Sequence, residues 1–447
     1  MFDHPRHPLT SLFCIPTLLL ALNLPLAAAG PAPPPTSRFR FADGDRVVLI
    51  GNTLIERAQR FGHLESALVA RLAPLKLTFR NLGWSGDTVF AESRGIFDSP
   101  AKGYQRLLEH VARLKPTVLI LGYGSNESFD GPKGLAKFLR QYSKLIADLR
   151  ARAAPSARVV ILSIPPQQQP GLGRLNTSQL NTSQLKTGRL KTGRLTLQFK
   201  GVTISASPSF TRSQLDSPVA RNRQIKEYNA ALAQFAKTNR HSLLDLNTPF
   251  ESLWNEQLGR YRLQFTVEGR ALNSTGYQIL STGILDQLHA MSPLTVQLQD
   301  KQPPRVIGPL ATSQTTYRDG RLQLSARPGR FVLRVQGLPR GRYRLKIGQD
   351  DFGKVSSNDL AAGIGLASSR PPAGFQTLRK AVIAKNRLYF HRWRPQNTTY
   401  LFGFRKHEQG NNAKEVAQFE KLVAAAEATI DRLKTRVLYR ITIEPSQ

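Results

Sequence analysis

The sequence is poor in cysteine and in acidic residues. Cys14 is the single cysteine among 447 residues, which excludes an internal disulfide framework and a multi-thiolate metal site. Asp and Glu number 30 against 63 Lys and Arg, so the formal net charge is +33. Such an excess favours anionic surfaces, for example an anionic polysaccharide or an envelope surface. The basic residues are spread along the chain without a recognition helix, which argues against specific nucleic-acid binding.

Cofactor motifs are also missing. The chain has no dinucleotide-binding or Walker glycine pattern and no pair of histidines at helical metal-ligand spacing. We therefore expect no cofactor and no metal site.

The N-terminal segment predicts export. Residues 1–29 combine a weakly basic start, an apolar run over 15–26 and three small residues before a Pro-rich linker at 30–38. The apolar run is shorter than the ~18 residues that a membrane span needs, so a cleaved signal peptide is favoured over an anchor. Phe13 precedes Cys14, which argues against a lipoprotein anchor. We expect a periplasmic or extracellular protein.

Short apolar runs alternate with amphipathic stretches in the main part of the chain. The runs are RVVLI (46–50), LKLTFRNL (75–82), TVLILGY (117–123), ARVVILSI (157–164) and HSLLDLN (241–247). This alternation predicts an α/β fold, a flavodoxin-like three-layer parallel sheet with helices on both faces. Ligands bind such sheets beyond the carboxyl ends of the strands, so the residues that follow each run are the informative ones.

The chain divides into a main domain and a smaller C-terminal part. We assign the main domain to 39–291, with an insertion at about 166–215 that carries two copies of NTSQL and two of KTGRL. These polar repeats predict a poorly ordered surface segment rather than a β-solenoid, because so few turns bury no core. Alternating residues predict a small β unit at 292–360, and a helical C-terminal extension follows at 361–447.

Four motifs follow the apolar runs in a characteristic order: Gly51-Asn52-Thr53, NLGWSGDT (81–88), Gly124-Ser125-Asn126-Glu127 and VEGRALNSTGY (267–277). This order resembles the SGNH, or GDSL-type, hydrolase family over roughly residues 40–291. IGNTLIER, GSNESF and FGFRKHEQGNNAKE further resemble large exported members of planctomycete-like bacteria. The resemblance implies the SGNH hydrolase fold and ester hydrolysis, with acylated carbohydrate or similar esters as substrates.

The resemblance also implies roles for single residues. Thr53 takes the place of the family's nucleophilic serine and Asn52 that of the neighbouring aspartate, while Gly86 and Asn126 match the oxyanion donors. Glu268 takes the place of the triad aspartate, and Ala271 stands where the family has histidine. Asn52 and Glu127 are candidates for substrate binding.

The missing histidine removes the general base. Without a base near pKa 7 a threonine hydroxyl is a poor nucleophile, and its β-branch stiffens the side chain. Candidate replacements are His63, His289, His391, His407 and Glu127. For each histidine a structural role is favoured, Glu127 more simply orients its loop, and Asp87 is more simply a turn residue. Tyr389, Phe390, Trp393 and Tyr400 either stack on sugar rings or pack the C-terminal part onto the main domain.

Three hypotheses follow from these residues. The first is an ester hydrolase with weak or absent activity, and the second is a non-catalytic pseudo-esterase that binds an acyl or sugar ligand. The third is a surface-interaction protein in which the basic charge and the insertion matter more than the cleft.

Overall fold

The computed structural model describes residues 39–152, 155–168, 186–189, 195–199, 202–205, 218–255, 260–261, 263–288, 292–300, 302–368 and 370–446. The predicted signal peptide and linker, Cys14, His289 and the two NTSQL copies lie outside these residues. Within them, no helix has both the length and the apolar character that crossing a membrane requires.

A parallel five-stranded sheet forms the centre of the main domain. Its spatial order is β2 (Thr78–Asn81), β1 (Arg46–Gly51), β3 (Val118–Gly122), β4 (Arg158–Leu162) and β8 (Ser242–Leu244). Successive residues of a strand point to opposite faces, so Val47 and Leu49 enter one hydrophobic core and Val48 and Ile50 the other. The predicted flavodoxin-like, three-layer α/β fold is confirmed.

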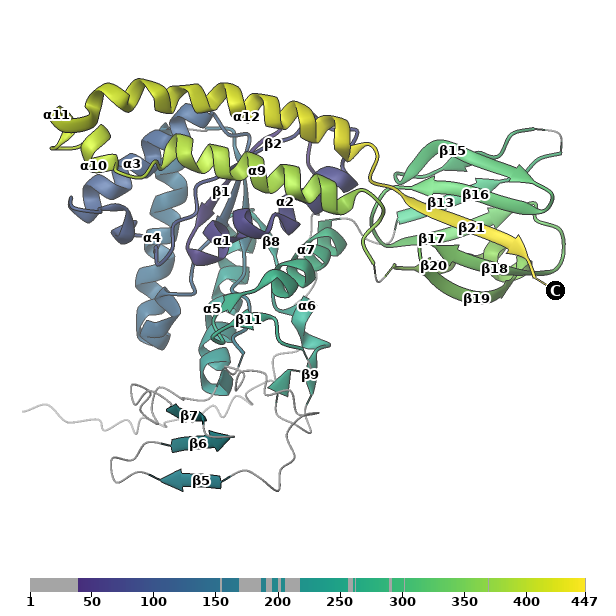
Figure 1. The fold of residues 1–447 in the computed structure, drawn as a ribbon, viewed down its shortest axis with the longest axis horizontal. Coiled ribbons are helices and arrows are strands. Elements are labelled where there is room, and N and C mark those ends of the chain that lie inside the picture. Colours follow the sequence, from purple (N-terminus) through teal and green to yellow (C-terminus); the bar gives the residue numbers. More distant parts are fainter. Residues whose placement is uncertain are drawn as a thin grey trace, which may run out of the picture. The chain divides into compact units, whose positions relative to one another are not determined.

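Helices cover both faces of this sheet (Figure 1). α1 (Thr53–Phe61), α2 (His63–Arg71) and α7 (Ser274–Leu288) share the core of Val47. α3 (Pro100–Leu114), α4 (Gly131–Arg152) and α5 (Pro218–Thr238) share the core of Val48. Short elements complete the connections: η1 (Glu92–Arg94), η2 (Glu127–Asp130), α6 (Thr248–Glu251), and the strand pairs β9 (Trp254–Asn255) with β10 (Arg260–Tyr261) and β11 (Thr266–Val267) with β12 (Ala271–Leu272).

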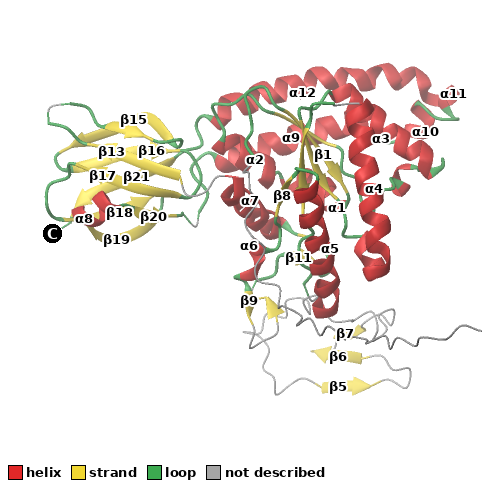
Figure 2. Ribbon diagram, turned by 180° about the vertical axis from the view of Figure 1, so that it is seen from behind, coloured by secondary structure: helices red, strands yellow, loops and turns green. Residues whose placement is uncertain are grey.

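Two C-terminal helices pack onto the main domain. α9 (Phe375–Trp393) and α12 (Ala413–Lys434) run side by side, and α10 (Thr398–Leu401), α11 (Lys406–Gln409) and η4 (Gly410–Asn412) join them (Figures 1 and 2). The ammonium group of Lys385, 1% exposed, lies 2.6 Å from Glu65 Oε1 and donates to the carbonyl of Phe79 at 3.1 Å. Arg80 of β2 pairs with Glu427 of α12 at 2.5 Å. These buried polar contacts fix α9 and α12 against α2 and β2.

The β unit consists of two sheets around a third core. One sheet has the order β14 (Arg305–Ile307), β13 (Ser292–Gln297), β17 (Phe331–Gln336) and β20 (Ile364–Leu366). The other has β15 (Ala311–Arg318), β16 (Arg321–Ala326), β21 (Tyr439–Pro445), β18 (Arg342–Ile347) and β19 (Asp350–Ser356), and α8 (Ser357–Ala362) follows β19. Strand β21 lies between β16 and β18, so the chain leaves the β unit for α9 and α12 and then returns to it.

This return differs from the predicted division into a β unit at 292–360 and a helical extension at 361–447. Both β20 and β21 belong to the β unit although they follow residue 360. The alternation of β21 buries Ile441 and Ile443 in the third core, but alternation cannot indicate which strands a segment will join.

The segment predicted as a poorly ordered insertion contains three short strands. β5 (Lys186–Arg189), β6 (Leu195–Phe199) and β7 (Val202–Ser205) form an antiparallel sheet. Strand β5 begins in the first KTGRL copy, so part of the repeat forms local β structure that the polar composition did not predict.

Candidate active site

The first motif lies where β1 turns into α1. A Cβ on Gly51 would lie 2.3 Å from the carbonyl oxygen of Gly122, so only glycine fits between the ends of β1 and β3. Asn52 is the N-cap of α1, and its side-chain oxygen accepts from the N–H of Leu54 at 3.0 Å. Its amide donates to Ser125 Oγ at 3.2 Å and so links the first motif to the third.

Thr53 and Gly86 meet at the head of α1. The backbone N–H of Gly86 donates to Thr53 Oγ1 at 3.1 Å. Gly86 is exposed and has φ +74°, a left-handed conformation that favours glycine. The predicted nucleophile position and the first predicted oxyanion donor are therefore brought together.

The loop that carries Gly86 is fixed along the first turn of α1. The N–H of Trp84 donates to the carbonyl of Gly51 at 2.9 Å. A Cβ on Gly83 would lie 2.2 Å from the backbone nitrogen of Glu56. The hydroxyl of Ser85 donates to Glu56 Oε2. Close backbone approach at Gly83 thus places residues 84–86 over the head of the helix.

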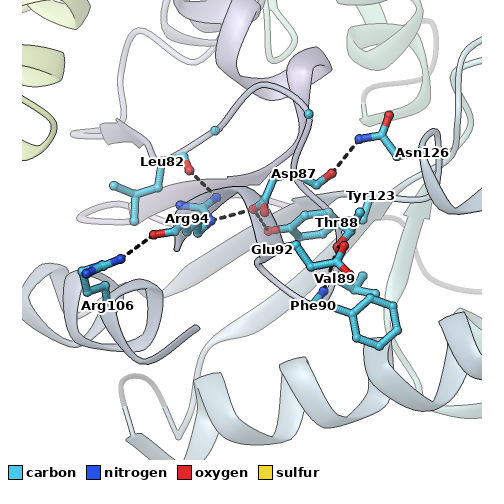
Figure 3. Close-up of polar contacts among 12 residues, drawn as sticks. Leu82, Asp87, Thr88, Val89, Phe90, Glu92, Arg94, Arg106, Tyr123 and Asn126 are labelled. Atoms are coloured by element: carbon cyan, nitrogen blue, oxygen red, sulfur yellow. Dashed lines mark hydrogen bonds and ion pairs between the residues drawn. The ribbon is translucent and has the colours of Figure 1, made fainter. Parts of the chain in front are cut away.

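Asn126, the second predicted donor, is held against the same loop. Its side-chain amide donates to the carbonyl oxygen of Asp87 at 2.9 Å (Figure 3). Asn126 is half-buried, so its amide lies at the boundary between the protein and solvent. The two predicted donors, Gly86 and Asn126, therefore come from adjacent loops, after β2 and β3.

Asp87 is more than the turn residue that the sequence predicted. It is fully buried, and its Oδ2 accepts from Arg94 Nε at 2.6 Å and from the hydroxyl of Tyr123 at 3.3 Å (Figure 3). Burial raises the pKa of Asp87 against the opposing effect of Arg94. Arg94 also donates to the carbonyl of Leu82 at 2.9 Å, so one buried ion pair ties together both ends of the Gly86 loop. Nothing in the local sequence around Arg94 indicated this role.

Both carboxylate oxygens of Glu127 accept hydrogen bonds from backbone N–H groups. Oε1 accepts from the N–H of Val89 at 2.8 Å, and Oε2 accepts from the N–H of Gly124 at 2.9 Å. Burial raises its pKa to about 7. With both oxygens occupied, the geometry favours loop orientation over the predicted substrate-binding role. Arg221 of α5 supports the same loop by donating to the carbonyls of Ser125 and Ser128, both at 2.8 Å.

The fourth motif forms the β11–β12 hairpin. Glu268 lies at its exposed tip with φ +53°, and Ala271 begins β12. Gln168, which follows β4, holds the hairpin: its N–H donates to the carbonyl of Gly269 at 2.9 Å, and its side-chain oxygen accepts from Thr266. Among the described residues, no hydrogen bond joins Glu268 to a histidine or to Thr53.

Within the described residues, no hydrogen bond joins a candidate histidine to Thr53. His63 is buried, and its Nε2 lies 2.9 Å from Ser274 Oγ at the start of α7. Burial, together with Arg379, lowers its pKa to about 4. His391 packs beside the rings of Phe390 and Phe419, and exposed His407 lies 3.7 Å from Glu408. The structural interpretation fits all three.

The end of α9 contacts the Gly86 loop. The guanidinium of Arg394 lies 3.4 Å from the centroid of the Trp84 ring, and Trp393 packs against Trp84 at 6.0 Å. Burial lowers the pKa of Arg394. The structure therefore favours the packing interpretation of the C-terminal aromatic cluster, and it adds Arg394, which the sequence did not single out.

Within the described ranges, no three His, Cys, Asp or Glu side chains are grouped to hold a metal ion. A pocket lined by Phe39, Ala157 and Ser242 lies where β4 and β8 begin, at the edge of the sheet opposite the four motifs.

The chain is similar to one protein-family model and to several solved structures. Residues 49–279 match the model of the GDSL-like Lipase/Acylhydrolase family. A gut microbial diltiazem-metabolizing enzyme superposes with a TM-score of 0.53 at 16% identity, over 91% of this chain and 99% of its own. An acetyl-xylooligosaccharide esterase from Geobacillus gives a TM-score of 0.36 at 14% identity, over 56% of this chain and 96% of its own. No curated protein matches the sequence. The likeness to the diltiazem-metabolizing enzyme shows a shared fold.

Proposed function

The chain belongs to the GDSL-like lipase/acylhydrolase family, and we propose that it is an exported ester hydrolase of low turnover that acts on acylated carbohydrate or similar esters. Export is proposed from the signal-peptide pattern of residues 1–29 and the likeness to planctomycete-type members. The net charge of +33 suits an anionic polysaccharide or envelope surface as the place of action.

One observation carries the proposal: the N–H of Gly86 lies 3.1 Å from Thr53 Oγ1, and the loop of Asn126 adjoins it. Acyl transfer builds negative charge on the carbonyl oxygen, and preorganised donors that face this charge lower the barrier. The buried Asp87–Arg94 pair and Glu127 hold both loops in place, so the donors need little reorganisation during the reaction.

Low turnover is proposed because the expected general base is missing. Ala271 cannot take a proton. His63, the histidine nearest to Thr53 in the sequence, is hydrogen-bonded to Ser274. Loss of general-base assistance costs typically ~10²–10⁴ in rate. If turnover is absent altogether, the alternative is a pseudo-esterase that keeps the donors to bind an acyl or sugar ligand.

The test is hydrolysis of acetyl and short-acyl esters, including acetylated sugars, by the mature protein and by Asn126→Ala. Loss of one oxyanion donor is expected to lower kcat by ~10²–10³. Asn358→Ala, an exposed asparagine on α8 in the β unit, is the matched control and should leave kcat unchanged.

Two outcomes would contradict catalysis at this site. Turnover that Asn126→Ala leaves intact would place the activity elsewhere or in a contaminant. A parent without turnover, but with calorimetric binding of an acetylated sugar that Asn126→Ala abolishes, would establish the pseudo-esterase alternative.

A further inference from the structure

A second hydroxyl, that of Ser85, precedes Gly86 in the chain and is hydrogen-bonded to a carboxylate that could accept its proton. Ser85 is exposed, and its hydroxyl donates to Glu56 Oε2. Glu56 is one turn after Thr53 on α1, so this hydroxyl–carboxylate pair lies at the head of the same helix. A nucleophile within hydrogen-bonding distance of a proton acceptor is the arrangement that nucleophilic catalysis requires.

From this geometry we infer that Ser85 is the acylated nucleophile and Glu56 its general base. The inference rests on the proposed ester hydrolysis and names the two groups that the Thr53 and Ala271 positions do not supply. Sequence reasoning missed them because Ser85 and Glu56 are 29 residues apart and belong to different motifs.

Thr53 is the weaker candidate on two grounds. It is half-buried, and its β-branch restricts χ1. Ser85 is exposed, and its side chain is unbranched. In addition, the N–H of the residue after a nucleophile commonly serves as an oxyanion donor, and here that residue is Gly86.

The position of Ser85 is fixed by contacts other than its own hydrogen bond. The N–H of Trp84 donates to the carbonyl of Gly51, and the backbone at Gly83 lies close to the backbone of Glu56. These two contacts hold the residues before Ser85 against the first turn of α1. Arg394 covers the ring of Trp84, and its positive charge interacts with Glu56. The end of α9 therefore completes the surroundings of the pair.

The reaction balances without a cofactor. Ser85 Oγ bonds to the ester carbonyl carbon, its proton passes to Glu56 Oε2, and the carbonyl π pair becomes an oxyanion. The intermediate collapses with cleavage of the bond to the alkoxy oxygen, which leaves as the alcohol with the proton from Glu56. Water then attacks acyl-Ser85 and gives a proton to Glu56. The carboxylic acid departs, and the proton returns to Ser85 Oγ.

Ser274 and His63 form a competing hydroxyl–base pair at 2.9 Å. Ser274 is exposed, but it lies at the start of α7, and among the described residues no hydrogen bond joins it to Gly86 or Asn126. The experiment must therefore distinguish Ser85, Thr53 and Ser274.

A fluorophosphonate probe distinguishes them, because it transfers its phosphonyl group to an activated hydroxyl with loss of fluoride. The full mature protein is labelled, and the modified residue is located by peptide mass spectrometry. We expect the adduct on Ser85, its loss in Ser85→Ala, and labelling at least ~10²-fold slower in Glu56→Gln, which keeps an acceptor oxygen but takes no proton.

Kinetics provide the second readout. Ser85→Ala should lower kcat at least ~10³-fold, and Thr53→Ala should lower it less. Ser356→Ala is the matched control: Ser356 also donates to a carboxylate, Asp359, but caps α8 in the β unit. It should be labelled and turn over substrate like the parent. Circular dichroism verifies that each variant is folded.

The possible failures are distinct. An adduct on Thr53 or Ser274, with turnover that depends on that residue, would overturn the role of Ser85 and leave ester hydrolysis in place. Unchanged turnover in Ser85→Ala would do the same. Absence of both label and turnover would overturn this inference together with the proposed hydrolase.

Discussion

The two loops that carry Gly86 and Asn126 are built differently from the β11–β12 hairpin, which carries the fourth motif. The loops contain a fully buried ion pair, Asp87–Arg94, and a buried carboxylate, Glu127, with both oxygens bonded. The hairpin depends on contacts with Gln168 and exposes Glu268 at its tip. The candidate site therefore has two unlike halves: the loops of Gly86 and Asn126, which buried polar contacts fix, and the hairpin, which carries alanine at residue 271.

The largest effect is expected from breaking the buried Asp87–Arg94 ion pair beside the Gly86 loop. Asp87→Asn leaves Arg94, which is 3% exposed, without its counter-charge. Removing one partner of a buried ion pair costs about 3–5 kcal/mol of unfolding free energy. Urea denaturation followed by circular dichroism measures this loss, and ester turnover should fall as the Gly86 loop loosens.

Asp98→Asn is the matched control, because Asp98 pairs with Arg106 at the surface. Its unfolding curve should superimpose on that of the parent. A stable Asp87→Asn variant with parental turnover would show that the buried ion pair does not hold the donors.

The second prediction concerns His63, the histidine that follows α1. Its folded pKa of about 4 lies below the ordinary value of 6.5, so the unfolded state binds the proton more tightly. Its contribution to stability is therefore complete above pH 6.5 and is lost as the pH falls towards 4. His63→Gln keeps a hydrogen-bonding side chain near Ser274 and should remove about 3 kcal/mol of this acid destabilisation.

Free energies of unfolding measured from pH 7 to pH 4 test the prediction. In His63→Gln the free energy of unfolding should still fall somewhat towards pH 4, because burial also lowers the pKa of His110 to about 4. His407→Gln, at an exposed histidine, should leave the pH profile unchanged. Equal slopes in parent and His63→Gln would contradict the buried, neutral state of His63.

The smallest effect is expected from placing a serine at residue 53 and a histidine at residue 271 of the hairpin. β12 packs beside α1, and Ala271 is half-buried at its start. The double variant Thr53→Ser/Ala271→His supplies the family's nucleophile and base, and we expect kcat/KM to rise ~10²-fold, mainly above pH ~6.5 where histidine is neutral. Thr53→Ser alone should gain less. A folded double variant without gain would mean that the hairpin does not present residue 271 to α1.

The sequence determined the local architecture and the order of the motifs. Apolar runs with turn residues at their ends follow from backbone geometry, and parallel strands bring their carboxyl ends to one edge, so Thr53, Gly86 and Asn126 could be predicted to converge. Likewise, the alternating pattern of 322–348 was sufficient to predict β structure.

The tertiary structure decided which distant side chains meet. Ser85 reaches Glu56 across 29 residues, His63 reaches Ser274 across 211, and Lys385 reaches the carbonyl of Phe79 across 306. Strand β21 joins a sheet that the chain left after β19, at residue 356. Periodicity reports only which face of an element is buried, whereas these contacts depend on how whole elements pack and how closely backbones can approach. The assignment of Ser85 and Glu56 therefore needed the fold.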